Sequence, residues 1–341
     1  MAERAGIQKR WFLCIILLVV FSLILYVTNQ YKFPQSFPNH KAQNFEVTML
    51  AGADLPDLEP GIMFVETSDT LIPSELTMCA IESAALVNSR KQVYYFIKEF
   101  SGNISALEQT KFKGLHLLSS IHNITLLPLD LDDLFYGTPL FDWYKKIDPE
   151  HEEYWIHVLS DACRIALLWK YGGIYLDTDI ISLKPLDFIN FICEQSYNYA
   201  NGAALGFSRN HPFTKESMFE YVEKYIGGKW GQQGPDLITR MLKKWCETQE
   251  INDFLNKTCK GVTFYPKDWF YPIPYSNWQS YFENGRWEEN NSVEDQFSET
   301  RGVHIWNFLS NRNTRYIKDT QSYMEYFFKN YCPRTYETLQ Q

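Results

Sequence analysis

Apolar residues are distributed differently before and after about residue 60. Residues 11–27 form an apolar run without a charge, and residues 28–59 contain prolines and show little periodicity. From Gly61 onward, short apolar runs alternate with segments in which apolar residues recur at helical spacing. Alternating strands and helices are typical of an α/β domain with a mainly parallel central sheet, so we expect that fold class here.

Individual strands and helices can be placed along this part of the chain. The predicted strands are Gly61–Thr67, Gln92–Ile97, Ile124–Leu129 and Gly172–Leu176, and the predicted helices are Glu75–Leu86, Ser160–Lys170 and Asp236–Trp245. In open sheets of this type, ligands bind beyond the carboxyl ends of the strands. Glu66 and Thr67 end the first strand and Asp177 follows the last, so we expect these residues to line one binding site.

The motif Asp177-Thr178-Asp179 is the most informative feature of the sequence. Side chains alternate between the two faces of a strand, so Asp177 and Asp179 are predicted to point the same way and to bind one divalent cation. Mg²⁺ and Mn²⁺ prefer octahedral shells of oxygen ligands, which a nucleotide diphosphate would complete. An exposed acidic turn is the alternative that the doublet alone leaves open.

The helix before this motif carries a second pair of polar residues. Ser160 or Asp161 is predicted to cap its first turn, and Gly172 suits a left-handed cap at its end. Asp161 and Arg164 are three residues apart, so they project from one face near the helix N-terminus and are candidates for binding sugar hydroxyls. A local ion pair that supports the helix start is the alternative. The glycines belong to no phosphate-loop motif, which excludes that class of site.

Charge and length suggest how the chain is organised around a membrane. The first ten residues hold three Arg and Lys residues, which predicts a cytoplasmic N-terminus. The 17 uncharged residues that follow would form a helix roughly 26 Å long, just sufficient for a thin bilayer. No small-x-small cleavage site comes after them, so we expect an uncleaved signal anchor. The predicted segments are a cytoplasmic tail (1–10), the anchor (11–27), a stem (28–59) and a lumenal domain (60–341).

A lumenal domain carries further expectations. N-glycosylation sequons begin at Asn103, Asn123, Asn256 and Asn290. Six of the seven cysteines follow the anchor and are available for disulfides, whose pairing the sequence does not show. A net charge of −9 argues against nucleic acid as a partner. The 10 Trp, 22 Tyr and 24 Phe fit carbohydrate-stacking surfaces as well as core packing.

The segments Ser160-Asp161, Arg164 and Trp169–Asp179 resemble the sugar-nucleotide core of α1,4-glycosyltransferases, and the similarity extends from Gly61 to about Pro333. This resemblance implies a GT-A type fold in a single lumenal domain behind a transmembrane helix, a UDP-sugar donor, Mn²⁺ as the cofactor and retention of anomeric configuration. It also implies a single-pass type II protein of the Golgi membrane. The acceptor would be a glycoprotein or glycolipid glycan that ends in β-galactose.

The same resemblance bears on the donor sugar. Residues 211–213 and 332–336 are more similar to family members that transfer GlcNAc, whereas residues 159–161, Leu176 and residues 270–274 are more similar to those that transfer galactose. On balance we expect UDP-GlcNAc, with UDP-Gal as the alternative. The pocket contacts that distinguish an acetamido group from a hydroxyl do not show in a motif.

Roles for single residues also follow from the resemblance. The metal ligands would be Asp177, Asp179 and His304; Asp161, Arg164, Gly172 and Gly173 would bind the donor sugar; Glu66, Thr67 and Trp306 would bind the nucleotide; and Gln233 would approach the anomeric carbon. For His304 the alternative is a structural role, and for Gln233 it is a tight turn before the next helix. Trp230 and Trp306 are candidates for stacking on sugar or uracil, with core packing as the alternative.

Retention is expected to proceed by front-face attack, because the sequence places no second carboxylate opposite the metal apart from the candidate Asp236.

Two other classes of protein share some of these features. A haloacid dehalogenase-type phosphatase also uses Asp-x-Asp, but its motif continues with Thr or Val where this chain has Ile181. A catalytically silent, lectin-like membrane protein is disfavoured by the intact acidic pair together with Asp161 and Arg164.

Overall fold

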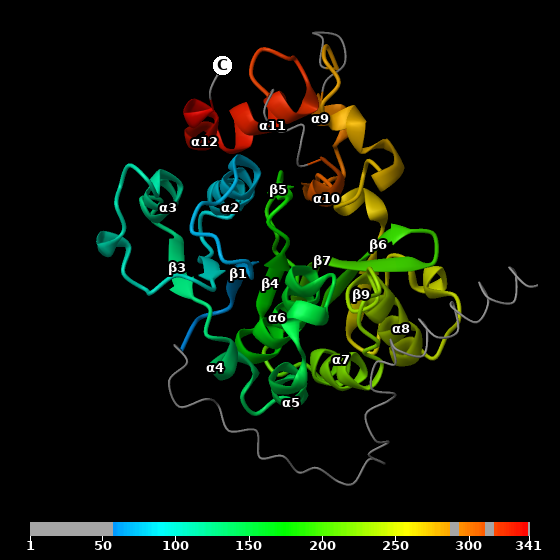
Figure 1. Ribbon diagram of the computed structural model, residues 1–341. Helices are drawn as coiled ribbons and strands as arrows, with labels where there is room; N and C mark the ends of the chain where they lie inside the picture. The colour runs from blue at the N-terminus through cyan, green and yellow to red at the C-terminus, as the bar shows by residue number, and fades with distance from the viewer. Residues whose placement is uncertain (1–56, 287–292, 311–316, 340–341) are drawn as a thin grey trace, which may run out of the picture. The chain divides into compact units, whose positions relative to one another are not determined.

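The computed structural model describes residues 57–286, 293–310 and 317–339 (Figure 1). These residues belong to one compact unit, Thr48–Gln341. The predicted cytoplasmic tail and signal anchor, nearly all of the predicted stem and the sequon at Asn290 lie outside them. Within the described ranges, no helix combines the length and the apolar composition that crossing a bilayer requires.

One half of the main sheet is parallel, as predicted. Its strands lie in the order β3 (Ile124–Pro128), β2 (Val93–Ile97), β1 (Gly61–Glu66) and β4 (Gly173–Leu176), and each neighbouring pair is parallel. Successive residues of β1 are buried in two different cores, with one on each side of the sheet. The strand therefore has an uninterrupted apolar sequence where a half-exposed strand would alternate.

The other half of the sheet is mixed. β7 (Tyr199–Phe207) is antiparallel to β4, β6 (Phe191–Ser196) is antiparallel to β7, β9 (Val262–Tyr265) is parallel to β6, and β8 (Lys257–Cys259) is the antiparallel edge. Four of the seven pairings in the sheet are thus parallel. β5 (Ile180–Ser182) directly follows β4 along the chain. It pairs with β10 (Gly302–His304) in a separate two-stranded antiparallel ribbon.

Helices cover both faces of the main sheet (Figure 1). One side carries α2 (Glu75–Val87), α3 (Lys113–Ser119), α11 (Tyr323–Tyr331) and α12 (Pro333–Thr338). The other side carries α4 (Leu131–Phe135), α5 (Pro139–Lys146), α6 (Trp155–Tyr171), α7 (Pro212–Glu223) and α8 (Pro235–Cys246). The short elements are α9 (Val293–Gln296), α10 (Asn307–Ser310), η1 (Ile104–Ala106), η2 (Pro149–His151), η3 (Ile251–Phe254), η4 (Lys267–Trp269) and η5 (Tyr275–Tyr281).

Of the two caps predicted for α6, the C-terminal one is confirmed and the N-terminal one is wrong. The helix begins at Trp155, five residues before the predicted start, so Ser160 and Asp161 lie inside it and the prediction that one of them caps it is wrong. The apolar stripe continues upstream through buried Val158 and Leu159, which extends the helix in that direction. At the other end, Gly172 follows with a φ of 70°, as predicted for a glycine stop.

Four of the cysteines form disulfides in the structure, and the asparagines of the described sequons differ in their exposure to solvent. Disulfides join Cys79 to Cys332 and Cys246 to Cys259, while Cys163 and Cys193 are free and buried. Asn103 and Asn256 are exposed. The prediction for Asn123 is wrong, because that residue is 2% exposed and its Nδ2 donates to the carbonyl oxygens of Ala85 and Lys91. The folded domain leaves no room for a glycan on this nitrogen.

Glu82 on α2 is fully buried and holds the C-terminal helix in place. Its carboxylate accepts hydrogen bonds from the backbone N–H groups of Arg334 (2.9 Å) and Thr335 (2.8 Å) and from the Thr335 hydroxyl (2.7 Å). Cys79, one turn earlier on α2, forms its disulfide with Cys332. One charged acceptor and one covalent bond therefore fix the N-terminus of α12 to a helix that lies 253 residues earlier in the sequence.

We expect Glu82→Gln to lower the free energy of unfolding by about 2–3 kcal/mol, because an amide nitrogen would face donors that now meet a carboxylate oxygen. Chemical denaturation of the purified protein measures this change. Glu75→Gln on the exposed start of the same helix is the matched control and is expected to cost under about 1 kcal/mol. Equal losses in the two variants would contradict the role assigned to Glu82.

Candidate active site

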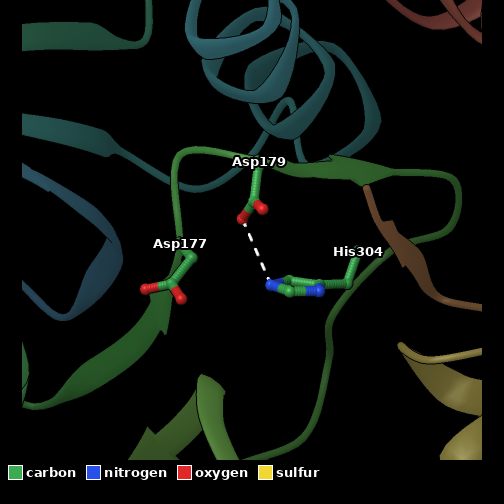
Figure 2. A group of neighbouring side chains, drawn as sticks. All are labelled: Asp177, Asp179 and His304. Atoms are coloured by element: carbon green, nitrogen blue, oxygen red, sulfur yellow. Dashed lines mark ion pairs between the residues drawn. The ribbon is translucent and has the colours of Figure 1, made fainter. Parts of the chain in front are cut away.

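Asp177 and Asp179 lie in the turn that joins β4 to β5, at the carboxyl end of β4. The N–H of Ile180 donates to the carbonyl of Asp177 (3.0 Å) and closes this turn. Ligand atoms of Asp177, Asp179 and His304 all lie within 4.8 Å of one another, and Figure 2 shows the three side chains around one point. The predicted meeting of the carboxylates is confirmed, but a turn aligns them and not the predicted alternation along a strand.

His304 reaches this point from the far end of the chain. It is the last residue of β10 and pairs with Ile180 of β5, directly after Asp179. Its Nε2 lies 3.3 Å from Oδ1 of Asp179. The N–H groups of Ile305 and Asn307 donate to the carbonyl (3.0 Å) and to Oδ2 (2.8 Å) of Asp179, respectively. The ribbon β5–β10 therefore sets the distance between the acidic motif and the histidine.

Arg164 links the two pairs of polar residues that the sequence analysis selected. Its Nη2 lies 3.0 Å from Oδ1 of Asp177 and 3.2 Å from Oδ1 of Asp161, and its side chain is 8% exposed. The guanidinium group also lies over the ring of Tyr175, 4.9 Å from the centroid. The predicted ion pair on α6 exists, and it extends to the acidic motif.

The charges in this cluster do not balance. Burial raises the pKa of Asp161 to about 7; the charge of Arg164 opposes this rise and that of Asp177 adds to it. Burial likewise raises the pKa of Asp179. The nearby His304 lowers this pKa, and the charge of Asp177 raises it further. The cluster thus holds three carboxylates, of which Asp161 and Asp177 contact the guanidinium group of Arg164 and Asp179 contacts the imidazole of His304. Two carboxylates and an imidazole with an excess of negative charge are a donor set that fits a divalent cation.

Two family models match the chain. The sugar-binding region containing the DXD motif of glycosyltransferases matches residues 74–197, and the α1,4-glycosyltransferase conserved region matches residues 206–339. Human α-1,4-N-acetylglucosaminyltransferase is 37% identical over 279 residues, which cover 82% of this chain and 80% of that enzyme. Human lactosylceramide 4-α-galactosyltransferase is 43% identical over 282 residues, covering 82% and 78%. This chain belongs to the α1,4-glycosyltransferase family.

Membership of this family makes the chain a glycosyltransferase. It excludes the phosphatase alternative. Among solved structures, the galactosyltransferase LgtC in complex with sugar analogues aligns over 82% of this chain and 96% of its own, with a TM-score of 0.41 and 13% identity. No residue role follows from so distant a likeness.

Two glycines of the transferase lie against the charged cluster. A Cβ at Gly234 would lie 2.9 Å from Oδ1 of Asp161, and a Cβ at Gly202 would lie 3.1 Å from Nη1 of Arg164. Gln233, beside Gly234, is 3% exposed and donates from Nε2 to the carbonyl of Tyr221 (2.7 Å). Its carboxamide is thus anchored one residue from the cluster, and its approach to an anomeric carbon stays a prediction.

Glu66 and Thr67 lie where predicted, at the carboxyl end of β1 and next to β4. Glu66 accepts a hydrogen bond from the N–H of Ser68 (2.8 Å), and the hydroxyl of Thr67 donates to the carbonyl of Ile156 in α6 (2.9 Å). These contacts shape the loop after β1. A role in binding the nucleotide stays a prediction for both residues.

The structure does not bring Gly172 and Gly173 to the cluster. They lie at the opposite end of β4 from Asp177, about 13 Å away along the strand. A Cβ at Gly173 would lie 2.3 Å from the carbonyl oxygen of Gly61, so this position is glycine because β1 and β4 approach closely. Direct contact with a donor sugar at the cluster is incompatible with this placement.

Trp306 packs against the imidazole of His304 in the cluster. It is 8% exposed, its indole N–H donates to the carbonyl of Ile273 (2.9 Å), and its ring centroid lies 4.3 Å from that of His304. This contact fixes the plane of the imidazole. Stacking on uracil, the predicted role, remains untested.

Two tyrosines of the site were not among the residues predicted from the sequence. The hydroxyl of Tyr175 donates to Oδ1 of Asp177 (2.8 Å), and the spacing of two residues at a strand end was the signal that could have found it. Tyr271 is buried, with its ring 5.5 Å from that of His304. Burial and the nearby carboxylate of Asp177 raise its pKa, and its hydroxyl has no hydrogen-bond partner in the described part of the chain. No pattern in the sequence indicates Tyr271.

The raised pKa of Asp161 predicts a pH dependence of stability. A carboxyl group with a pKa of about 7 in the folded state and about 4 in the unfolded state binds its proton more tightly when folded. The free energy of unfolding should therefore fall from pH 4 to pH 7 more steeply in the unmodified protein than in Asp161→Asn. Denaturation in EDTA at several pH values measures this difference. Parallel profiles would contradict it, and Asp187→Asn, with a side chain that is 66% exposed, is the control.

Proposed function

We propose that this chain is a retaining α1,4-glycosyltransferase that moves GlcNAc from UDP-GlcNAc to a terminal β-galactose of a glycan. The observation that carries the proposal is the cluster of Asp177, Asp179 and His304, whose ligand atoms lie within 4.8 Å at the carboxyl end of β4. Ligands of open α/β sheets bind at that edge. The name of the human GlcNAc-transferring relative supports the choice of donor.

Mn²⁺ would be held by Asp177, Asp179 and His304. When bound, a divalent cation neutralises the charge that develops on the departing diphosphate. Other residues of the chain hold the two carboxylates in position for the cation. Arg164 and Tyr175 fix the carboxylate of Asp177, and the N–H of Asn307 and the imidazole of His304 fix that of Asp179.

The carboxylates around the site support front-face attack. Asp161 is paired with Arg164, Asp179 with His304 and Asn307, and Asp236 accepts a hydrogen bond from the hydroxyl of Tyr199 (2.6 Å). In the described residues, these three carboxylates are thus already engaged by neighbouring groups. The anomeric carbon then breaks its bond to the UDP oxygen and forms a bond to the acceptor's 4-oxygen on the same face, and the 4-hydroxyl proton passes to the departing phosphate oxygen.

Transfer of galactose from UDP-Gal to a lactosylceramide-like glycolipid is the second candidate. Its specific support is the higher identity, 43% against 37%, to the human enzyme named for that reaction. Both candidates use the same cluster of residues. They differ only in the sugar of the donor and in the group that carries the acceptor galactose.

A lumenal site in the Golgi, behind the predicted anchor at residues 11–27, belongs to the same proposal. It is supported by the disulfides Cys79–Cys332 and Cys246–Cys259, because structural disulfides form and persist in oxidising compartments. The exposed sequons at Asn103 and Asn256 agree with that location.

Asp177→Asn should lower kcat for transfer by about 10³-fold or more, because the change removes a negative charge from the cation site and leaves Arg164 with a weaker partner. The same variant should bind Mn²⁺ at least about tenfold more weakly by calorimetric titration. Asp187→Asn on an exposed side chain is the control for both measurements. Unchanged turnover with Mn²⁺ in a folded Asp177→Asn protein would refute the metal assignment.

The donor can be decided by one assay. Purified protein, Mn²⁺ and lactose are incubated with UDP-GlcNAc or UDP-Gal, and the product linkage is read by NMR. We expect kcat/KM to be at least about tenfold higher for UDP-GlcNAc, with an α1,4 product. The reverse preference would establish the galactosyl alternative, and a β-linked product would overturn retention.

A further inference from the structure

Two aromatic side chains are exposed beside the charged cluster. Trp230 is 47% exposed and Phe308 is 59% exposed, yet their rings stack on each other with centroids 4.3 Å apart and an interplanar angle of 29°. His157 makes edge contacts with both rings, at 4.8 Å and 5.5 Å, and Tyr154 makes an edge contact with Trp230 at 5.2 Å. We call Trp230, Phe308 and His157 the aromatic platform.

The platform borders the catalytic cluster. Phe308 directly follows Asn307, whose N–H binds Asp179. His157 lies one helical turn before Asp161 on the same face of α6.

The loop that carries Trp230 is held in one conformation by buried polar groups. Gln232 is 5% exposed, donates to the carbonyl of Lys224 (2.6 Å) and accepts from the N–H of Ile226 (3.2 Å). Glu152, also 5% exposed, accepts from the N–H of Gly228 (3.0 Å), which has a φ of 59°. Buried hydrogen bonds thus fix a loop whose tip presents a half-exposed indole. A side chain that served only to fill the core would lie inside the domain.

We propose that the aromatic platform is the acceptor subsite, on which the terminal β-galactose of the acceptor stacks. This inference rests on the proposed function and adds the residues that select the acceptor. One face of β-galactopyranose is lined by C–H groups, and the axial 4-hydroxyl points from the opposite face. Stacking of the C–H face on Trp230 or Phe308 buries apolar surface and leaves the 4-hydroxyl free to meet the donor. A sugar that lacks the axial 4-hydroxyl presents a different arrangement of C–H groups and hydroxyls on its faces. The subsite would therefore also select galactose over such sugars.

Transfer kinetics test the subsite. Trp230→Ala and Phe308→Ala should each raise KM for lactose about tenfold, with KM for the UDP-sugar changed less than about twofold. Trp230→Phe should recover most of the affinity for lactose. Tyr197→Ala removes an aromatic side chain that is 77% exposed and lies outside the platform, so it is the matched control. Thermal unfolding of each variant verifies folding, which exposed side chains should barely alter.

Binding without turnover separates this inference from the proposed function. Saturation-transfer NMR with lactose, in the presence of UDP and Mn²⁺, should show contact to the galactose protons and lose it in Trp230→Ala, while maltose gives no signal. If lactose binds in this way but no UDP-sugar is consumed, the proposed function fails and the subsite stands. If the platform variants behave like Tyr197→Ala, or lactose does not bind the unmodified protein, the subsite is refuted.

Discussion

The contact of Arg164 with both Asp161 and Asp177 is the interaction on which the site depends. Arg164 lies in the middle of α6, where packing against the sheet leaves its side chain 8% exposed, and it is the counter-charge for two carboxylates from two different elements. Without it, the cluster would hold uncompensated charges of one sign in a poorly hydrated place. With it, the excess negative charge is reduced to what one divalent cation can balance.

The second constraint is the ribbon β5–β10. It crosses from the end of β4 to a strand more than a hundred residues later, and its pairing of Ile180 with His304 sets the third ligand at a fixed distance from the acidic turn. The same segment continues into Asn307 and Phe308, so one short stretch of chain supplies both a residue of the candidate metal cluster, His304, and one ring of the aromatic platform.

The C-terminal part of the chain is fixed to the first half of the domain by contacts that serve no catalytic purpose. Glu82 and the disulfide Cys79–Cys332 tie α12 to α2, and α11 packs into the core on the same side of the sheet. β10 lies between these anchors and the mixed half of the sheet. The cluster joins residues of the β4–β5 turn to a histidine more than a hundred residues later, so its geometry depends on such ties, because a shift of about 1 Å in His304 would open it.

The sequence by itself determined the parallel strands, the acidic motif and the family, because apolar runs and short motifs are local patterns. It placed β1 to β4 within one residue at each end and brought Asp161, Arg164, Asp177, Asp179 and His304 together correctly. Only the tertiary structure decided that α6 begins at Trp155, that Asn123 is buried and that Gly172 and Gly173 lie at the wrong end of β4 for a donor site. Tyr271 and the stacked pair of Trp230 and Phe308 belong to the same group, since contacts between residues far apart in the chain leave no periodic trace in it.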